Sequence, residues 1–320
     1  ADVLRYAHRY GRFGTDGHLI EPSELEARIA ERENVPADHV LVAHGATELL
    51  QLCAVAFGDG GIATQIPTYG TIIGYANRLG GDIRMFPLRE DMHYDLDGFL
   101  DGAAGDAGCV YLCHPNNPTG LIEPQPKLEA FCRAAARDAV VVADEAYHEF
   151  VEAPGYRSLV ALVREGTEVV VLRTFSKAYG MAGIRVGYAV APPELLRPLR
   201  GLQVGPINVV SLVGARAGLA SRAFLEESRT KIAATRSRVV ERLRRMGLSS
   251  LDSQTNFLLV DVGRPVGPVM AGLRSRGVRV ASTMLRNSTR FRLTIGTDDE
   301  IDTFLDALDA VLARASDRSE

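Results

Sequence analysis

Residues 169–190 read VVVLRTFSKAYGMAGIRVGYAV: two short apolar runs separated by a segment of small hydroxyls and glycines around one lysine, Lys177. Runs this short and this apolar are typical of strands buried on both faces of a sheet. A lysine in a desolvated pocket beside such a strand has a lowered amine pKa, which makes the amine a nucleophile toward an aldehyde. Taken alone the Ser-Lys pair is weak evidence, because most lysines are exposed.

The same pattern extends upstream and predicts an α/β fold. Between about residues 37 and 206, short β-rich runs alternate with helical stretches that begin at 46 and about 69 and that cover 126–137. The β-rich runs are 40–43, 61–66, 83–88, 109–114, 140–145, 169–175 and 186–191. This alternation is typical of a mostly parallel sheet with helical crossovers, which we expect to form a large domain over 37–206.

Three further parts are expected outside this domain. Residues 207–247 form a long tract of good helix formers, which predicts a connecting helix. Residues 248–320 hold three β-rich runs and two helical stretches, which predict a smaller α/β domain. The amphipathic stretch 21–32 predicts a helix within an N-terminal segment, 1–36, that we expect to pack with the small domain.

The composition excludes several classes of protein. With 320 residues, 46% of them hydrophobic and 24% charged, the chain has the composition of a soluble protein of roughly two domains. A net charge of -4 and a pI near 6.0 argue against a nucleic-acid-binding protein. No apolar run reaches the 18 residues of a membrane span. A reducing cytoplasm is expected because the cysteines show neither zinc-site spacing nor the density of a secreted disulfide scaffold; they are Cys53, Cys109, Cys113 and Cys132.

Two segments supply groups suited to a phosphate. His44-Gly-Ala-Thr-Glu48 stands between a predicted strand and a predicted helix, and Ala46 and Thr47 are small enough for backbone N–H groups at the helix start to close on an anion. A plain turn capped by Thr47 is the alternative. The lysine segment adds hydroxyls and a guanidinium of the kind that bind phosphate, on Thr174, Ser176 and Arg185.

Two more segments follow buried strands and therefore lie at the carboxyl edge of the predicted sheet, where open α/β folds bind ligands. The first, HPNNPTG (114–120), also has the composition of an ordinary turn. The second, VADEAY (142–147), ends a strand with Asp144, and a buried acid is costly unless it meets a cation. The protonated ring nitrogen of a pyridoxal cofactor would meet that need.

The motifs GATE, P-TYG, NNPTG, DEAY, T-SK and R-VGY occur in this order between about residues 22 and 310. Their order resembles that of fold-type I pyridoxal-phosphate aminotransferases, most closely the histidinol-phosphate aminotransferase branch. The resemblance implies an aspartate-aminotransferase-like fold, pyridoxal 5'-phosphate as cofactor, an amino donor and an oxo-acid acceptor as substrates, and a homodimer.

The resemblance also assigns roles to single residues. Lys177 resembles the lysine that forms a Schiff base with the cofactor, and Asp144 resembles the partner of the ring nitrogen. Asn117 and Tyr147 resemble the donors to the ring hydroxyl, and Tyr69 the aromatic residue that stacks on the ring. The phosphate cup is matched by Ala46, Thr47, Thr174, Ser176 and Arg185.

In the predicted small domain, RFRLTIG (290–296) is similar to the strand whose arginine binds the substrate carboxylate, and Arg292 is the matching residue. The planar guanidinium fork of an arginine pairs bidentately with a carboxylate. Strand alternation places Arg290 on the same face as Arg292, so a structural ion pair is the alternative for either residue.

Two departures from the family pattern concern the substrate. Ala281 stands where histidinol-phosphate aminotransferases carry an arginine for the substrate phosphate, so the expected substrate is an aromatic or other amino acid, or an amino-acid-like amine, rather than histidinol phosphate. Arg279 and Arg286 lie close enough in sequence to leave a replacement open.

The second departure is N-terminal. The family's opening segment, which folds over the site, is not found and is expected upstream of Ala1. Tyr10 is matched to the tyrosine that reaches the neighbouring subunit's cofactor phosphate and is a substrate-binding candidate, with Tyr6 as its competitor.

Three other functions are alternatives to that of an aminotransferase: another enzyme of the same fold, a non-catalytic regulator and a nicotinamide enzyme. A decarboxylase, or a cyclase or oxidase of biosynthesis on the same fold, would share every cofactor residue. A non-catalytic regulator would carry a basic DNA-binding module, which this sequence does not show. A nicotinamide enzyme is not expected, since no GxGxxG motif opens a βαβ unit.

Overall fold

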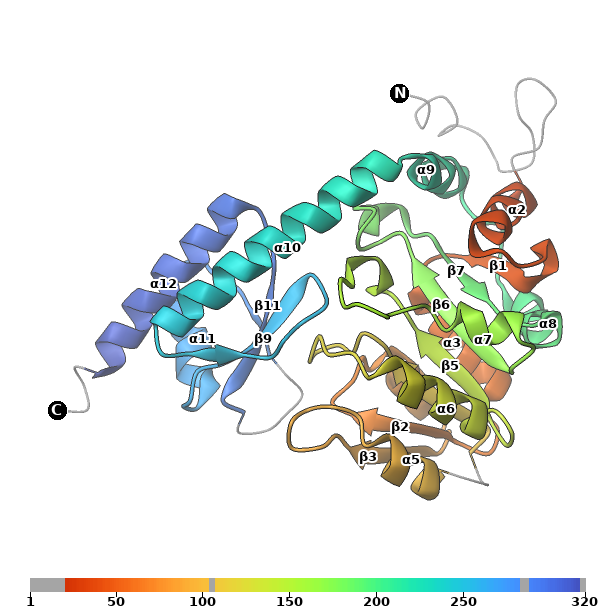
Figure 1. Cartoon of the computed structure of the whole chain (residues 1–320), viewed down its shortest axis with the longest axis horizontal. Coiled ribbons are helices and arrows are strands. Elements are labelled where there is room, and N and C mark those ends of the chain that lie inside the picture. The colour runs from red at the N-terminus through yellow and green to blue at the C-terminus, as the bar shows by residue number, and fades with distance from the viewer. Residues whose placement is uncertain (1–20, 104–106, 283–287, 317–320) are drawn as a thin grey trace.

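The computed structural model describes residues 21–103, 107–282 and 288–316 of the chain. Figure 1 shows two α/β bodies of unequal size joined by the long helix α10 (Arg222–Arg245). No helix among the described residues is long and apolar enough to cross a membrane.

The larger body is built on a sheet of seven strands in the order β1-β7-β6-β5-β4-β2-β3. The strands are β1 (Val40–Ala43), β2 (Ile62–Ile66), β3 (Ile83–Pro87), β4 (Cys109–Cys113), β5 (Val140–Asp144), β6 (Val169–Thr174) and β7 (Gly187–Val190). Only β7 runs antiparallel to its neighbours in this sheet, so the predicted, mostly parallel sheet is confirmed. Each of the seven predicted β-rich runs forms one strand.

Helices cover both faces of this sheet, which explains why its strands are apolar on both sides. One face packs against α3 (Ala46–Phe57), α4 (Thr71–Arg78) and α8 (Pro193–Leu202). The other face packs against α5 (Leu96–Ala103), α6 (Gln125–Ala135) and α7 (Val160–Arg164). Three single 3₁₀ turns complete the connections: η1 (Ala37–His39), η2 (His148–Phe150) and η3 (Ala182–Ile184).

The N-terminal helix α2 (Pro22–Glu33) covers the β1 edge of the large sheet. Its apolar face joins the core of the larger body, and the Glu26 carboxylate accepts a hydrogen bond from the Val42 amide at 3.1 Å and pairs with Arg200 at 3.1 Å. The expectation that this segment packs with the small domain is therefore wrong for the described residues. Because β1 is an edge strand, its outer side has apolar surface and amides without a strand partner. Helix α2 covers that surface, and its Glu26 accepts a hydrogen bond from the Val42 amide.

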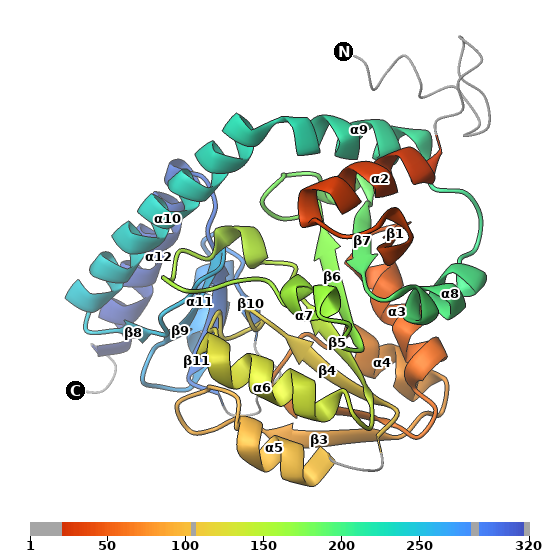
Figure 2. The same cartoon turned by 45° about the vertical axis from the view of Figure 1, so that its right-hand side comes forward.

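The predicted connecting helix is two helices, α9 (Val209–Ala220) and α10, which meet at Ser221. Ser221 has φ -96° and ψ 69°, which are not helical, and Figure 2 shows α10 leaving α9 at an angle. Helix α9 packs against α2, whereas α10 packs against β8 and α12 of the smaller body and against η2 of the larger one. The two packing directions require the break, although the sequence of the tract favours helix throughout.

The smaller body has a four-stranded antiparallel sheet in the order β10-β11-β9-β8. Its strands are β8 (Ser249–Ser250), β9 (Phe257–Asp261), β10 (Ala281–Ser282) and β11 (Arg290–Thr294). Helices α10, α11 (Val266–Arg274) and α12 (Asp298–Ser316) cover one face. On the other face Leu259 packs against Met92 and Leu121 of the larger body, so that face closes over the carboxyl edge of the large sheet.

Candidate active site

A pocket of about 200 Å³ opens at the carboxyl edge of the large sheet. Its lining residues are Ala46, Thr47, Tyr69, Asp144, Ala146, Tyr147, Thr174, Ser176, Lys177, Ala182 and Arg185. All but Ala146 and Ala182 are residues that the sequence singled out. Asn117 and Arg292 reach the pocket through Tyr147, as described below, whereas Tyr10 lies outside the described residues.

One end of the pocket carries groups that suit a phosphate. Helix α3 begins at Ala46, so the N–H groups of its first turn have no partner within the helix. The hydroxyl of Thr174 donates to Ser176 Oγ at 3.0 Å, and Arg185 Nη1 donates to the same oxygen at 3.2 Å. Gly45 has φ +85°, and a Cβ there would stand 2.8 Å from the Arg185 guanidinium. Glycine therefore lets the arginine lie against the helix start, where both favour an anion.

At the other end lies Asp144, which is 2% exposed. Its carboxylate accepts hydrogen bonds from the Ala146 amide at 3.1 Å and from the Tyr111 hydroxyl at 3.5 Å, and it forms no ion pair with any described residue. Burial raises the pKa of Asp144 to about 6. A cationic ring nitrogen would compensate this buried charge, so the residue fits the cofactor that the sequence predicted.

Lys177 lies between these two ends. Burial, and next the nearby Arg292 guanidinium, lower the pKa of the Lys177 amine, while Asp144 opposes them. Its Nζ lies 5.3 Å from the centre of the Tyr147 ring. A lowered pKa increases the fraction of neutral amine, which is the form that attacks an aldehyde and accepts a proton.

A chain of contacts joins the pocket to the smaller body. The Asn117 amide donates to the Tyr147 hydroxyl at 3.4 Å, and Arg292 Nη1 donates to Asn117 Oδ1 at 2.7 Å. The Arg292 guanidinium lies 5.1 Å from the centre of the Phe257 ring, which meets Tyr147 edge-on at 5.0 Å. Arg292 Nε is buried and has no hydrogen-bond partner in the described part of the chain. This nitrogen is available to a carboxylate.

Arg290 and Arg292 differ in their partners. Arg290 Nε pairs with Asp261 on the neighbouring strand at 2.9 Å, and both residues are only partly exposed. The structural ion pair that the sequence left open for either arginine therefore belongs to Arg290. Arg292 is the residue that points to the pocket.

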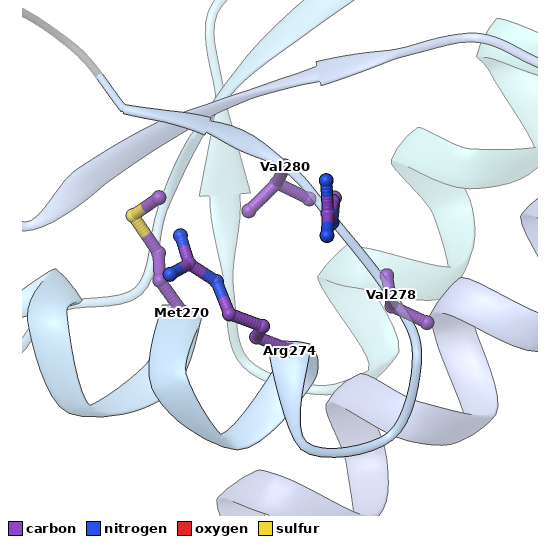
Figure 3. Close-up of a pocket in the computed structure, with 5 residues that line it drawn as sticks. Met270, Arg274, Val278 and Val280 are labelled. Carbon is purple, nitrogen blue, oxygen red and sulfur yellow. The ribbon is translucent and has the colours of Figure 1, made fainter.

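The neighbours of Arg292 across the small sheet are Ala281 on β10 and Leu259 on β9. Both are apolar. Arg279 does not line the cofactor pocket and instead lines another pocket with Met270 and Arg274, so it does not replace the missing arginine. Figure 3 shows Met270 and Arg274 of α11 in that pocket, together with Val278 and Val280. Arg286 lies outside the described residues.

Sequence reasoning missed two aromatic residues that contact the predicted ones. Tyr111 is fully buried on β4 and reaches Asp144, and Phe257 lies between Tyr147 and Arg292. The β4 run is apolar on both faces, so alternation gave no sign of which residues face the ligand edge. Phe257 opens the small-domain strand, and its contacts cross between the two bodies.

Comparison with known proteins identifies the family of the chain. The family model for aminotransferase class I and II matches residues 12–308. The chain is 33% identical to a histidinol-phosphate aminotransferase of Bacillus velezensis, over 90% of this chain and 81% of that protein. It is 36% identical to a protein of the same name from Symbiobacterium thermophilum, over 90% and 80%.

Solved structures give the same result. The crystal structure of histidinol-phosphate aminotransferase from Sinorhizobium meliloti in complex with pyridoxal-5'-phosphate superposes with a TM-score of 0.89, at 26% identity, over 98% of this chain and 85% of that one. L-threonine-O-3-phosphate decarboxylase from Porphyromonas gingivalis shares the fold, with a TM-score of 0.80 at 20% identity over 97% and 92%. The chain thus belongs to the class I and II aminotransferases, which are fold-type I enzymes with pyridoxal 5'-phosphate as cofactor.

Proposed function

We propose that this aminotransferase moves the amino group of an amino acid to an oxo acid, with Lys177 as both cofactor anchor and proton carrier. The observation that carries the proposal is the placement of one lysine of lowered pKa between a buried, unpaired carboxylate and a phosphate-binding helix start. When bound, pyridoxal 5'-phosphate supplies an aldehyde that accepts the amino group and a ring that delocalises the electrons left at Cα.

The pocket residues divide the work of holding this group. The start of α3 at Ala46 and Thr47 binds the phosphate, together with Thr174, Ser176 and Arg185. Asp144 pairs with the ring nitrogen and keeps it protonated. Tyr69 stacks on the ring face, and Asn117 and Tyr147 donate to the ring hydroxyl.

Lys177 then acts as the general base. Its neutral Nζ, when not bound to the cofactor, would take the Cα proton of the substrate and would deliver it within the same pocket. Arg292 fixes the substrate carboxylate, which orients the Cα–H bond toward Nζ. Residues at the contact between the two bodies, such as Leu259 and Met92, exclude water from one side.

Arg292→Lys tests the carboxylate site. Lysine keeps the charge and loses the bidentate fork, so kcat/KM for amino acids is expected to fall roughly 10- to 100-fold. Arg290→Lys, which keeps its pairing with Asp261, is the matched control and is expected to stay within about threefold of the original. Equal losses in the two variants would show that Arg292 does not bind the carboxylate.

Ala281 supports the second part of the proposal, that the substrate carries no phosphate. In the small sheet the two residues that flank Arg292, Ala281 and Leu259, are both apolar. We therefore assign an amino acid with an aromatic or other uncharged side chain rather than histidinol phosphate, the substrate that the names of the relatives imply.

Ala281→Arg is expected to raise kcat/KM for histidinol phosphate about tenfold, because it adds one charge-assisted contact beside Arg292. Steady-state kinetics with histidinol phosphate and with aromatic amino acids would measure the change. If the unaltered protein already prefers histidinol phosphate, the assignment of an uncharged substrate is wrong.

A same-fold decarboxylase is the second candidate, since the fold is shared with L-threonine-O-3-phosphate decarboxylase. Incubation with candidate amino acids, with assays for oxo acid and for carbon dioxide, separates the two reactions. Transamination yields oxo acid and depends on an acceptor. Stoichiometric carbon dioxide without oxo acid would favour the decarboxylase.

The assembly and location are proposals as well. We propose a homodimer in the cytoplasm, in which Tyr10 of one subunit completes the substrate site of the other. The four cysteines are free and buried, as a reducing compartment would allow. We also propose a large domain over 37–206, a connector over 207–247 and a small domain over 248–320, supported by the two separate sheets.

A further inference from the structure

A buried ion pair lies directly behind the cofactor pocket. Arg173 Nε meets Glu145 Oε2 at 2.8 Å, and the two residues are 2% and 1% exposed. They stand at the carboxyl ends of the adjacent strands β6 and β5. Neither residue lines the pocket.

The pair and the cofactor-facing residues occupy opposite faces of the sheet. Val142 and Leu172 belong to the core on the α3 side, so by strand alternation Asp144 and Thr174 face that way. Ala143 and Val171 belong to the opposite core, so Glu145 and Arg173 face α6 and α7. Each partner of the ion pair is thus the immediate chain neighbour of a residue that meets the cofactor.

The ion pair also lies just past the point where the backbone pairing of β5 with β6 ends. The last paired residues of β5 and β6 are Asp144 and Leu172, followed by one hydrogen bond from the Glu145 amide to the Leu172 carbonyl at 2.9 Å. Beyond that point Thr174 has no backbone tie to β5. The Glu145–Arg173 contact continues the connection between the two strands past the end of the ladder.

Glu145 is held by more than its partner arginine. Its carboxylate also accepts hydrogen bonds from the Ser158 hydroxyl and the Leu159 amide, both at 2.7 Å. Further charged and titratable groups surround the pair: Glu149, 3.6 Å from Arg173 Nη1; His148, 3.8 Å from Glu145 Oε2; and Arg32 and Tyr156. Three donors at short distances hold the Glu145 carboxylate in one orientation.

We infer that Glu145 and Arg173 are positioning residues that hold Asp144 at the correct distance from the phosphate-binding group Thr174. The cofactor is one rigid molecule whose ring nitrogen and phosphate must be met at both ends, so a small shift between β5 and β6 weakens one contact or the other. The inference rests on the proposed roles of Asp144 and Thr174.

Glu145→Gln tests it. The side-chain amide turns a donor or a weaker acceptor toward Arg173, so the strand ends lose their tie. The matched control is Glu26→Gln, which breaks another ion pair of a buried glutamate, with the exposed Arg200, at the β1 edge of the same sheet. Both variants are expected to lower the unfolding temperature of the cofactor-free protein.

Only Glu145→Gln is expected to change the binding and the absorbance of the cofactor. Its affinity for pyridoxal 5'-phosphate should fall roughly 10- to 100-fold, the range found for outer partners of metal ligands, and the pH midpoint of the visible absorbance should shift. Arg173→Lys, which keeps the charge, should change both quantities in the same direction by less. Arg173→Lys replaces Glu145→Gln as the test if Glu145→Gln does not fold.

A purely structural role predicts another outcome. The inference is overturned if the folded variant binds the cofactor within about twofold of the original protein and titrates at the same pH, as Glu26→Gln should. The assignment of the cofactor site itself is refuted if the wild-type protein shows no visible absorbance, or shows absorbance that does not depend on Lys177. The two failures are therefore distinguishable.

Discussion

Lys177→Ala is expected to lower kcat by about 10⁴-fold or more, because it removes both the cofactor anchor and the general base. Alanine leaves no group near the pocket to replace the amine, since the other two lysines, Lys127 and Lys231, are exposed on α6 and α10. Steady-state kinetics with an aromatic amino acid and an oxo-acid acceptor would measure the loss.

Lys127→Ala is the matched control for this experiment. Lys127 lies on the surface of α6 and lines no part of the site, so kcat is expected to stay within about twofold. Turnover by Lys177→Ala within about tenfold of the original protein would be incompatible with a catalytic role for that lysine.

Asp144→Asn is expected to have two large and opposite effects. Activity should fall roughly 10²- to 10³-fold, because a neutral amide no longer keeps the ring nitrogen protonated. The cofactor-free protein should become more stable at pH 8, by up to about 3 kcal/mol, because a buried charge is removed.

The sign of the stability effect follows from the direction of the pKa shift. Burial raises the pKa of Asp144 in the folded protein to about 6, above its ordinary value of 3.8. The penalty for ionising the carboxyl is therefore complete above pH about 6, and it disappears as the pH falls through that range to about 4.

Urea unfolding of the cofactor-free proteins at pH 8 and at pH 4 would measure this difference. The stability gain of Asp144→Asn should be present at pH 8 and absent at pH 4. An equal or lower stability of the variant at pH 8 would mean that the carboxylate already has a compensating partner, contrary to the role proposed for the ring nitrogen.

The sequence predicted the large sheet and most of the pocket for one physical reason. Strands buried on both faces are conspicuously apolar, and parallel strands end at the same edge, so Asp144 and Lys177 had to lie near one another. The family resemblance then supplied roles that spacing alone does not give, such as that of Tyr69.

Elements whose local sequence opposes their structure were not predicted. Helix α8 contains Pro198 in its interior, and α5 contains Gly98 and Gly102, all of which disfavour helix. In α8 the leucines that pack on the sheet, Leu195, Leu196 and Leu199, offset that cost. Tertiary burial decides these helices, and periodicity over so short a stretch is too weak to reveal it.

Contacts between distant residues were also beyond the reach of sequence patterns. Arg292 and Asn117 are 175 residues apart, yet they share a hydrogen bond of 2.7 Å. Glu145 and Arg173 carry opposite charges in otherwise apolar strands, but only the register of β5 against β6 shows that they meet. The ion pair is visible once the strands are aligned.

Reduction with borohydride in the presence of pyridoxal 5'-phosphate, followed by peptide mass spectrometry, shows which lysine binds the cofactor. The chain has three lysines, Lys127, Lys177 and Lys231, so the covalent link has few sites to form on. We predict one cofactor per chain, attached to Lys177. Attachment at Lys127 or Lys231 with Lys177 unmodified, or no attachment at all, would contradict it.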